Sequence, residues 1–396
     1  MADRLDPIFP PAYLGILGGG QLGRMFTQAA QDMGYRVCVL DPDPNSPAGA
    51  IAQKHLQADY LDPKALSEMS SLCAAVSTEF ENVPAQALDY FANQGIYVAP
   101  ASAAVSVAQN RVAEKKFLAT WKDEAGIGPA PHWVIEHEED IPHTPSELVP
   151  GILKTARMGY DGKGQRVIQS VAELADAWHE FGRVPCVLEK KLSLAYEVSA
   201  LVVRGHNDEV VAYPLAENQH RHGILHISMV PAPSIDAKTQ ERILDAARAI
   251  IRRLDYVGVL CIEFFVLSDG SVVSNEIAPR PHNSGHHTMD SCVTSQFEQQ
   301  VRALTRQPLG SVDLLSPVVM LNILGDVWLN EVAKANVLGL PAWDKVLADP
   351  KAKLHLYGKV EPKLGRKMAH INYLGKTLEA AKAQCEAGVA ILGIQK

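Results

Sequence analysis

Apolar runs and amphipathic segments alternate along the first hundred residues. The runs at 13–17 and 35–40 predict strands, and residues 22–33 between them predict a helix. Further apolar runs follow at 74–77 and 96–99. Regular alternation of strands and helices is typical of a parallel, doubly wound sheet. The chain is therefore expected to begin with an α/β domain.

The pattern changes after the first hundred residues. A helix is predicted over 110–121, and strands surround a glycine-rich loop within 132–195. Residues 196–300 are rich in strands, apart from an amphipathic helix at 239–254. A smaller module begins near residue 310 and ends in a helix. A chain of 396 residues is long enough for two or three domains, in agreement with these changes.

Composition narrows the class of protein. The net charge of −8 argues against wholesale binding to nucleic acid or to an anionic membrane. No apolar run approaches the roughly 20 residues that a membrane span needs. The six cysteines lie far apart without a CxxC pair, which favours reduced, buried thiols in a cytoplasmic protein.

A glycine pattern follows the first predicted strand. Gly18, Gly20 and Gly23 lie between this strand and the next helix, and Asp41 lies 21 residues beyond Gly20. This spacing satisfies the dinucleotide fingerprint, in which the helix N-terminus meets a pyrophosphate and the acid meets a ribose. An NAD-dependent dehydrogenase therefore stays open at this point, as does a purely structural turn.

A second glycine-rich loop follows the predicted strand at 151–154. Its glycines leave backbone amides free to approach an anion, and its lysine adds positive charge. The GK[ST] ending of a Walker loop is missing, so a flap over a triphosphate is the better interpretation. Lys154 lies on the preceding apolar strand, where a buried lysine needs an anionic partner. The loop residues are Gly159, Tyr160, Asp161, Gly162, Lys163, Gly164 and Gln165.

Two β-rich runs meet at Asp269 and Gly270, which favour a two-residue hairpin turn. Counting outward from that turn places Glu263 opposite Glu276, with Cβ atoms about 5 Å apart. Two carboxylates at this distance repel by roughly 3 kcal/mol at an effective dielectric near 20. We therefore expect a divalent cation between them, and Mg²⁺ with nucleotide phosphates fits oxygen ligands.

Two polar clusters follow this hairpin. The first contains Arg280, His282, His286 and His287, and it favours a site for substrate anions over zinc, because no HExxH or Cys/His pairing is present. The second is a basic run near the C-terminus. A solvated face is the default for such a run, but its alternation with apolar residues makes a phosphate site plausible. Its members are Lys353, Lys359, Lys363, Arg366 and Lys367.

These motifs together resemble one family along nearly the whole chain. The segments GGGQLGRM, TEFENV, MGYDGKGQ, EKKLSLAYEVS, NEIAPRPHNSGH and LYGK…GRKMAH are similar to the 5-(carboxyamino)imidazole ribonucleotide synthases. The resemblance implies an α/β (α+β) protein with the ATP-grasp fold. It implies a Rossmann-like domain at 1–105, an ATP-grasp domain at 106–305 with a flap subdomain at about 132–195, and a C-terminal domain at 306–396.

The resemblance also implies site residues. ATP would be bound by the flap, residues 159–165, and by residues on both sides of it in the chain: Arg111, Lys154, Glu189, Lys190, Lys191, Leu192, Glu197, His220, Asn275 and Glu276. Glu263 and Glu276 would hold Mg²⁺. The aminoimidazole ribonucleotide would contact Gly20, Gln21, Leu22, Glu79, Lys359, Arg366 and Lys367. Arg280, His282 and Lys359 would be catalytic, the first two near bicarbonate.

The implied reaction is ATP- and bicarbonate-dependent carboxylation of 5-aminoimidazole ribonucleotide in purine synthesis, through carboxyphosphate. The expected partners are these small molecules, and a cytoplasmic homodimer is expected. Three alternatives remain: another ATP-grasp ligase (a formate-dependent glycinamide ribonucleotide transformylase or a biotin carboxylase), an NAD-dependent dehydrogenase, and a non-catalytic nucleotide sensor. The paired glutamates argue against the last two, because neither needs a carboxylate pair.

Overall fold

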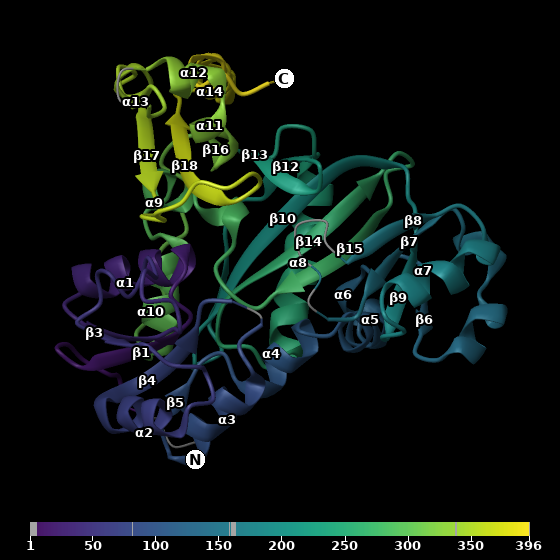
Figure 1. Cartoon of the computed structure of the whole chain (residues 1–396), viewed down its shortest axis with the longest axis horizontal. Helices are drawn as coiled ribbons and strands as arrows, with labels where there is room; N and C mark the ends of the chain where they lie inside the picture. Colours follow the sequence, from purple (N-terminus) through teal and green to yellow (C-terminus); the bar gives the residue numbers. More distant parts are fainter. Residues whose placement is uncertain (1–5, 81, 158, 160–163, 337–338, 396) are drawn as a thin grey trace.

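The computed structural model describes residues 6–80, 82–157, 159, 164–336 and 339–395. Three sheets organise this part of the chain (Figure 1). The predicted strands and helices near the N-terminus are confirmed within one or two residues at their ends. Within the described ranges, no helix is both long and apolar enough to cross a membrane.

The N-terminal sheet is parallel, with strand order β3-β2-β1-β4-β5. Apolar residues of β1 and β2 pack against α1, which explains the alternation in the sequence. The strands are β1 (Tyr13–Leu17), β2 (Arg36–Leu40), β3 (Lys54–Leu56), β4 (Cys73–Thr78) and β5 (Tyr97–Val98). The helices are α1 (Gln21–Asp32), α2 (Pro63–Leu72), α3 (Ala85–Asn93) and α4 (Ser102–Ala108).

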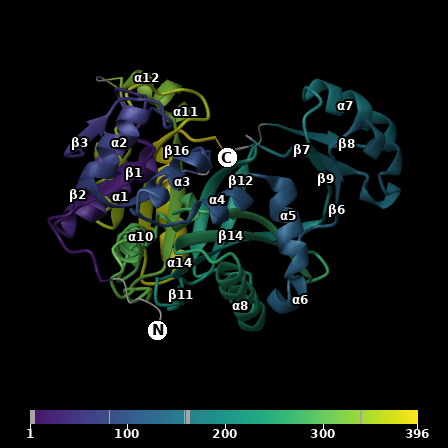
Figure 2. The same cartoon turned by 90° about the horizontal axis from the view of Figure 1, so that it is seen from below.

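Two helices lead from this domain to a four-stranded antiparallel sheet of order β6-β9-β7-β8. This sheet stands apart from the rest of the molecule (Figure 2). The connecting helices are α5 (Arg111–Thr120), capped by Asn110, and α6 (Lys122–Ala125). The sheet contains β6 (His132–Ile135), β7 (Gly151–Thr155), β8 (Gln165–Ile168) and β9 (Cys186–Lys190), and α7 (Leu174–Glu180) covers it.

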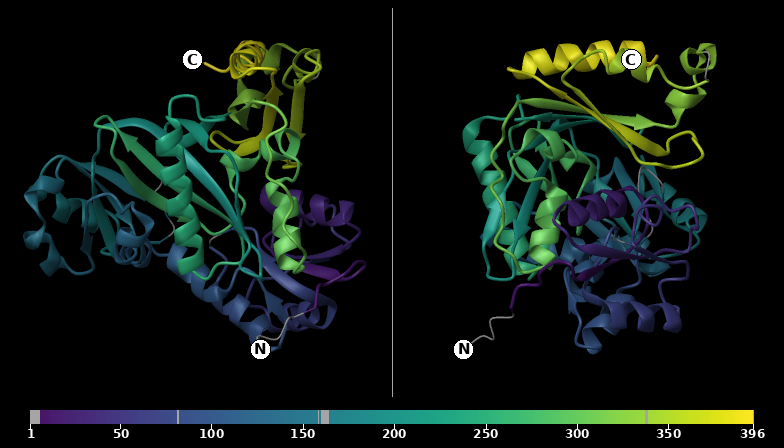
Figure 3. Two further views of the ribbon diagram at one scale, coloured as in Figure 1. Left: turned by 180° about the vertical axis from the view of Figure 1, so that it is seen from behind. Right: turned by 90° about the vertical axis from the view of Figure 1, so that its left-hand side faces the viewer.

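The largest sheet runs in the order β15-β14-β10-β12-β13-β16-β18-β17, and β11 pairs with β10. Helix α8 (Ala237–Arg253) packs its predicted apolar face on this sheet from behind (Figure 3). The central strands are β10 (Leu194–Arg204), β11 (Val210–Ala212), β12 (Ala216–Arg221), β13 (Ile224–Val230), β14 (Gly258–Leu267) and β15 (Val272–Ala278). Helices α9 (Thr288–Ser291) and α10 (Gln296–Leu304) follow, and α10 contacts α1.

The C-terminal strands extend this sheet, because β16 pairs with β13. The predicted final helix, α14 (Leu378–Ile391), covers these strands, and the two layers enclose an apolar core of their own. The strands are β16 (Val318–Leu324), β17 (Ala352–Leu356) and β18 (Lys367–Leu374). The short helices α11 (Asp326–Leu329), α12 (Glu331–Ala335) and α13 (Trp343–Val346) connect β16 to β17.

Candidate active site

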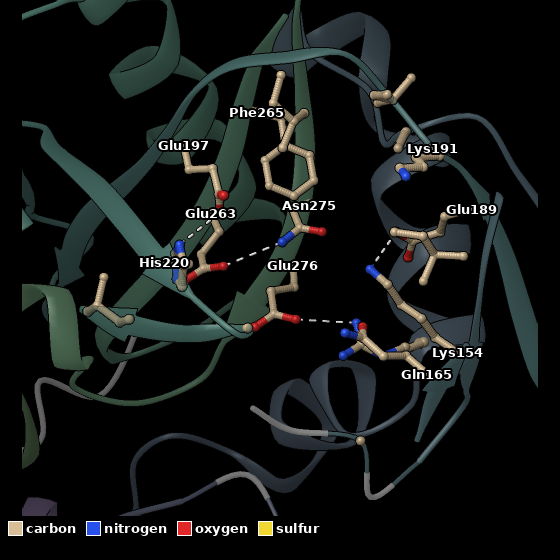
Figure 4. A pocket seen from close by; sticks show the side chains of 18 of the residues that line it. Lys154, Gln165, Glu189, Lys191, Glu197, His220, Glu263, Phe265, Asn275 and Glu276 are labelled. Carbon is tan, nitrogen blue, oxygen red and sulfur yellow. Dashed lines mark hydrogen bonds and ion pairs between the residues drawn. The ribbon is translucent and has the colours of Figure 1, made fainter. Parts of the chain in front are cut away.

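A cavity of about 450 Å³ lies between the four-stranded sheet and the edge of the large sheet (Figure 4). Ile152, Leu194, Leu225 and Phe265 supply apolar wall, and charged groups surround it. Most residues expected at the ATP and Mg²⁺ sites meet here: Arg111, Lys154, Gly159, Gln165, Glu189, Lys190, Lys191, Leu192, Glu197, His220, Glu263, Asn275 and Glu276. Gly164 has a positive φ of 66° and accepts a backbone hydrogen bond from Thr155. Tyr160, Asp161, Gly162 and Lys163 lie outside the described residues.

The expected pairing of Glu263 with Glu276 is confirmed, although the turn that connects their strands is not the expected one. Leu267 N donates to Ser271 O at 2.8 Å, so the loop holds the three residues 268–270 and the predicted two-residue turn is wrong. Gly270 takes the left-handed conformation that such a loop needs, with φ 82°. A β-bulge then restores the expected register, because Phe264 pairs with Ser274 while Glu263 pairs with Glu276.

The two carboxylates line the cavity and are partly exposed to it, Glu263 with 14% and Glu276 with 36% of its side chain. Burial first, and then the charge of Glu276, raises the pKa of Glu263 to about 7. Arg111 Nη1 lies 3.2 Å from Glu276 Oε2, and His282 Nε2 lies 3.5 Å from Glu263 Oε1. Among the described residues, no group of three or more His, Cys, Asp or Glu side chains is arranged to hold a metal ion. The candidate metal site is therefore a carboxylate pair that would need further ligands from a nucleotide.

A buried ion cluster forms the opposite wall of the cavity. Lys154 Nζ lies 2.7 Å from Glu189 Oε2, and Lys115 Nζ lies 3.1 Å from Glu189 Oε1. The prediction that Lys154 has an anionic partner is therefore confirmed. Burial alone would raise the pKa of Glu189, but the two lysines outweigh burial and hold the pKa at about 2. Glu189 therefore stays ionised beside the cavity.

Glu197 and His220 form a second polar contact on the cavity wall (Figure 4). His220 Nδ1 lies 2.9 Å from Glu197 Oε2. Burial disfavours the imidazolium, but the hydrogen bond and the charge of Glu197 raise the pKa of His220 above its usual value. The pair offers both an acceptor and a donor for a polar ligand.

A smaller cavity of about 250 Å³ adjoins the first. Part of its wall is formed by Gln21 and Leu22, at the start of α1, and by Glu79, just after β4. Arg280, His282, Asn283 and Lys367 line both cavities. These four side chains therefore form a common wall between the two cavities.

The glycine loop before α1 is occupied by side chains of the protein itself. Glu79 accepts hydrogen bonds from Gly20 N at 2.7 Å and from Gly23 N. Asp41 accepts from Gly19 N at 2.7 Å and from the hydroxyl of Tyr60 at 2.8 Å. A carboxylate thus stands where a dinucleotide needs its pyrophosphate, and the expected ribose acid is also engaged. This geometry contradicts the dinucleotide interpretation.

The basic residues of the tail occupy different places. Lys367 lines both cavities, and Lys359 Nζ donates to Lys367 O at 2.8 Å. Burial raises the pKa of Glu79, although the charge of nearby Lys359 opposes the rise. Arg366 donates to Glu361 O at 2.9 Å and is absent from the described lining of both cavities. Lys359 therefore lies near the smaller cavity, whereas nothing described brings Arg366 to it.

Comparison with known proteins agrees with this geometry. Residues 12–109 match the ribonucleotide synthetase preATP-grasp domain, residues 121–297 the ATP-grasp domain, and residues 318–384 the phosphoribosylaminoimidazole carboxylase C-terminal domain. The N5-carboxyaminoimidazole ribonucleotide synthase of Bacillus subtilis is 40% identical over 372 residues, covering 93% of this chain and 92% of the relative. The enzyme of that name from Brucella melitensis is 42% identical over 365 residues, covering 91% and 96%.

The chain belongs to the N5-carboxyaminoimidazole ribonucleotide synthase family. It is thus an ATP-grasp ligase, as the resemblance implied. A solved synthetase of this family in complex with ADP superimposes with a TM-score of 0.88 at 38% identity, covering 98% of this chain and 99% of that one. A synthase from Aspergillus clavatus, in complex with ADP and 5-aminoimidazole ribonucleotide, gives a TM-score of 0.86 at 28% identity, covering 98% and 100%.

His286, a member of the polar cluster expected to bind substrate anions, lines the smaller cavity. Two charged residues near the site were not predicted from the sequence: Glu114 and Lys115, which are buried on α5. The signal for the last two was present, because they follow Arg111 by three and four positions and so share its helix face. An adjacent acid and base on a buried face indicate partners inside the protein.

Proposed function

We propose that the chain carboxylates 5-aminoimidazole ribonucleotide to its N5-carboxy derivative, using ATP and bicarbonate and releasing ADP and phosphate, as a step of purine synthesis. The observation that carries this proposal is the common wall of the two cavities, formed by Arg280, His282, Asn283 and Lys367. ATP occupies the larger cavity and the ribonucleotide the smaller one. The names of the relatives, and the Aspergillus clavatus complex, support this assignment of ligands.

The larger cavity suits a triphosphate with Mg²⁺. Lys154 and Arg111 supply positive charge for phosphates, while Glu263 and Glu276 would hold the metal ion. The donor set fits, because both ligands are oxygen anions and burial leaves Glu263 in need of a cation or a proton. When bound, Mg²⁺ supplies charge neutralisation at the phosphates.

Arg280 and His282 would bind bicarbonate where the cavities meet. An oxygen of bicarbonate attacks the γ-phosphorus of ATP, and ADP leaves as carboxyphosphate forms. The guanidinium and lysine charges offset the charge on the transferring group, so catalysis is chiefly positioning and electrostatics. The exocyclic amine of the ribonucleotide then bonds to the carboxyl carbon and gives up a proton to phosphate. The C–O bond between the carboxyl group and phosphate breaks either in this step or beforehand, when carboxyphosphate releases CO₂.

The remaining expectations concern the phosphate of the ribonucleotide, the oligomeric state and the location of the protein. Lys359 and Lys367 would offset the phosphate of the ribonucleotide near the smaller cavity. For Arg366, the proposed phosphate contact would need the side chain to turn from Glu361. The homodimer and the cytoplasmic location stay predictions.

A steady-state assay of ADP release tests the proposal. We expect ADP release to require bicarbonate and 5-aminoimidazole ribonucleotide together, with incorporation of labelled bicarbonate into the product. Glycinamide ribonucleotide with formate, and biotin with bicarbonate, are the controls for the other ATP-grasp ligases. Faster ADP release with either control pair than with 5-aminoimidazole ribonucleotide would refute the assignment.

A further inference from the structure

Helix α5 turns one charged face towards the edge of the large sheet. Arg111, Glu114 and Lys115 share this face because they are three and four positions apart. Glu114 is 2% exposed and Lys115 is fully buried. An acid and a base at such depth require specific partners.

Those partners are backbone groups of β15, the edge strand of the sheet. Glu114 Oε1 accepts a hydrogen bond of 2.5 Å from Ile277 N, and Lys115 Nζ donates one of 2.6 Å to Asn275 O. These two backbone groups belong to the residues on either side of Glu276. The two side chains therefore hydrogen-bond to the strand on both sides of Glu276, the candidate metal ligand.

These two hydrogen bonds lie at the β-bulge of β15. Asn275 is the extra residue, because the neighbouring pairs are Phe264 with Ser274 and Glu263 with Glu276. Because β15 is the edge strand, the backbone groups on its outer side have no strand partner, which is unfavourable when they are buried. The α5 side chains satisfy two such groups, one on the bulge residue Asn275 and one on Ile277, two residues further along the strand.

The bulge decides which side chain faces Glu263. If the register near the turn continued without it, Asn275 would lie opposite Glu263. Glu276 would then pair with Ile262 and point to the other face of the sheet, because side chains alternate along a strand. Only the bulged register brings two carboxylates together.

We propose that Glu114 and Lys115 are positioning residues of the nucleotide site, which hold the bulge and thereby keep Glu276 opposite Glu263. This inference rests on the proposed metal site at that pair. Lys115 also lies 3.1 Å from Glu189 on β9, so one ammonium group connects both walls of the cavity. Neither residue lines the larger cavity itself, so both act through the groups that they hold.

The test compares ADP affinity with and without Mg²⁺ by calorimetry in four variants. Glu114→Leu and Lys115→Met remove the hydrogen bonds, and each is expected to reduce the Mg²⁺-dependent gain in affinity about tenfold. Glu114→Gln keeps an oxygen that accepts from Ile277 N, so most of the gain should return. Lys116→Met is the matched control, since Lys116 is the exposed neighbour on α5.

Hydrogen exchange of the β15 peptide is the second measurement and needs only a folded protein. In Lys115→Met, exchange in β15 should rise about tenfold over Lys116→Met. Parent-like Mg²⁺ dependence and parent-like exchange in Lys115→Met and Glu114→Leu would overturn the inference. Glu276→Gln separates the two proposals: if it leaves the Mg²⁺ dependence unchanged, the metal site itself is misplaced.

Discussion

Replacing Glu189 by Gln is expected to destabilise the protein by an amount that hardly depends on pH above pH 6. Glu189 is 3% exposed, and its carboxylate binds Lys154 at 2.7 Å and Lys115 at 3.1 Å. The substitution leaves the fully buried ammonium of Lys115 beside a neutral amide. Removing one partner from a buried ion cluster destabilises a protein more than replacing the whole cluster by apolar residues, because the remaining charge is left buried without a counter-charge.

The pKa of Glu189 sets the magnitude. The lysines overcome burial and lower this pKa from 4.5 to about 2. A shift of this size corresponds to about 3 kcal/mol, at about 1.4 kcal/mol per pKa unit. Because the folded-state pKa is depressed, the stabilisation is complete above the unfolded pKa of 4.5 and is lost as pH falls towards 2. The gap between variant and parent should therefore be constant from about pH 6 to about pH 8.

Urea unfolding at several pH values in this range measures the gap. Glu180→Gln is the matched control, because Glu180 forms an exposed ion pair of 2.6 Å with Arg166 at the surface of the same sheet domain. Exposed pairs contribute about 0–1 kcal/mol, so the control should lie close to the parent. A loss in Glu189→Gln no larger than in Glu180→Gln, or a gap that closes between pH 6 and pH 8, would refute the reasoning.

Three further outcomes are expected. Glu263→Gln should raise the melting temperature of the ligand-free protein at pH 8 but not at pH 4. Burial and Glu276 raise the pKa of Glu263 from 4.5 to about 7, so its destabilising effect sets in as pH rises above 4.5 and is complete above about pH 7; equal effects at both pH values would contradict this. Gly20→Ala should raise the KM for the ribonucleotide at least about tenfold, because its Cβ would lie 2.4 Å from Glu79 Oε1. Lys359→Met should raise that KM and leave the KM for ATP unchanged; an equal rise in both would move Lys359 elsewhere.

The sequence predicted the carboxylate pair but not the path that produces it. Asp269 and Gly270 favour a two-residue turn, yet the loop contains Ser268 as well. The extra residue in the loop shifts the register by one position, and the extra residue in the strand, Asn275, shifts it back. The pairing of Glu263 with Glu276 was therefore predicted correctly. In this protein side chains on α5 contact the backbone at the bulge, and a count along one hairpin does not contain that information.

Periodicity predicted local elements well because their apolar faces are encoded within each segment. It did not predict that β16 would pair with β13, since pairing between segments far apart in the chain depends on tertiary packing. The glycine pattern before α1 was ambiguous for a similar reason. Its local spacing fits a dinucleotide, and only the approach of Glu79 and Asp41 from other strands shows that its amides are already engaged.

The central claim is that ATP phosphorylates bicarbonate in the larger cavity and that the ribonucleotide beside it is carboxylated as a result. Turnover with bicarbonate labelled with heavy oxygen tests this directly, with the released phosphate analysed by mass spectrometry. If an oxygen of bicarbonate attacks the γ-phosphorus, one labelled oxygen appears in each phosphate formed. Phosphate free of the label, formed alongside carboxylated ribonucleotide, would contradict the account.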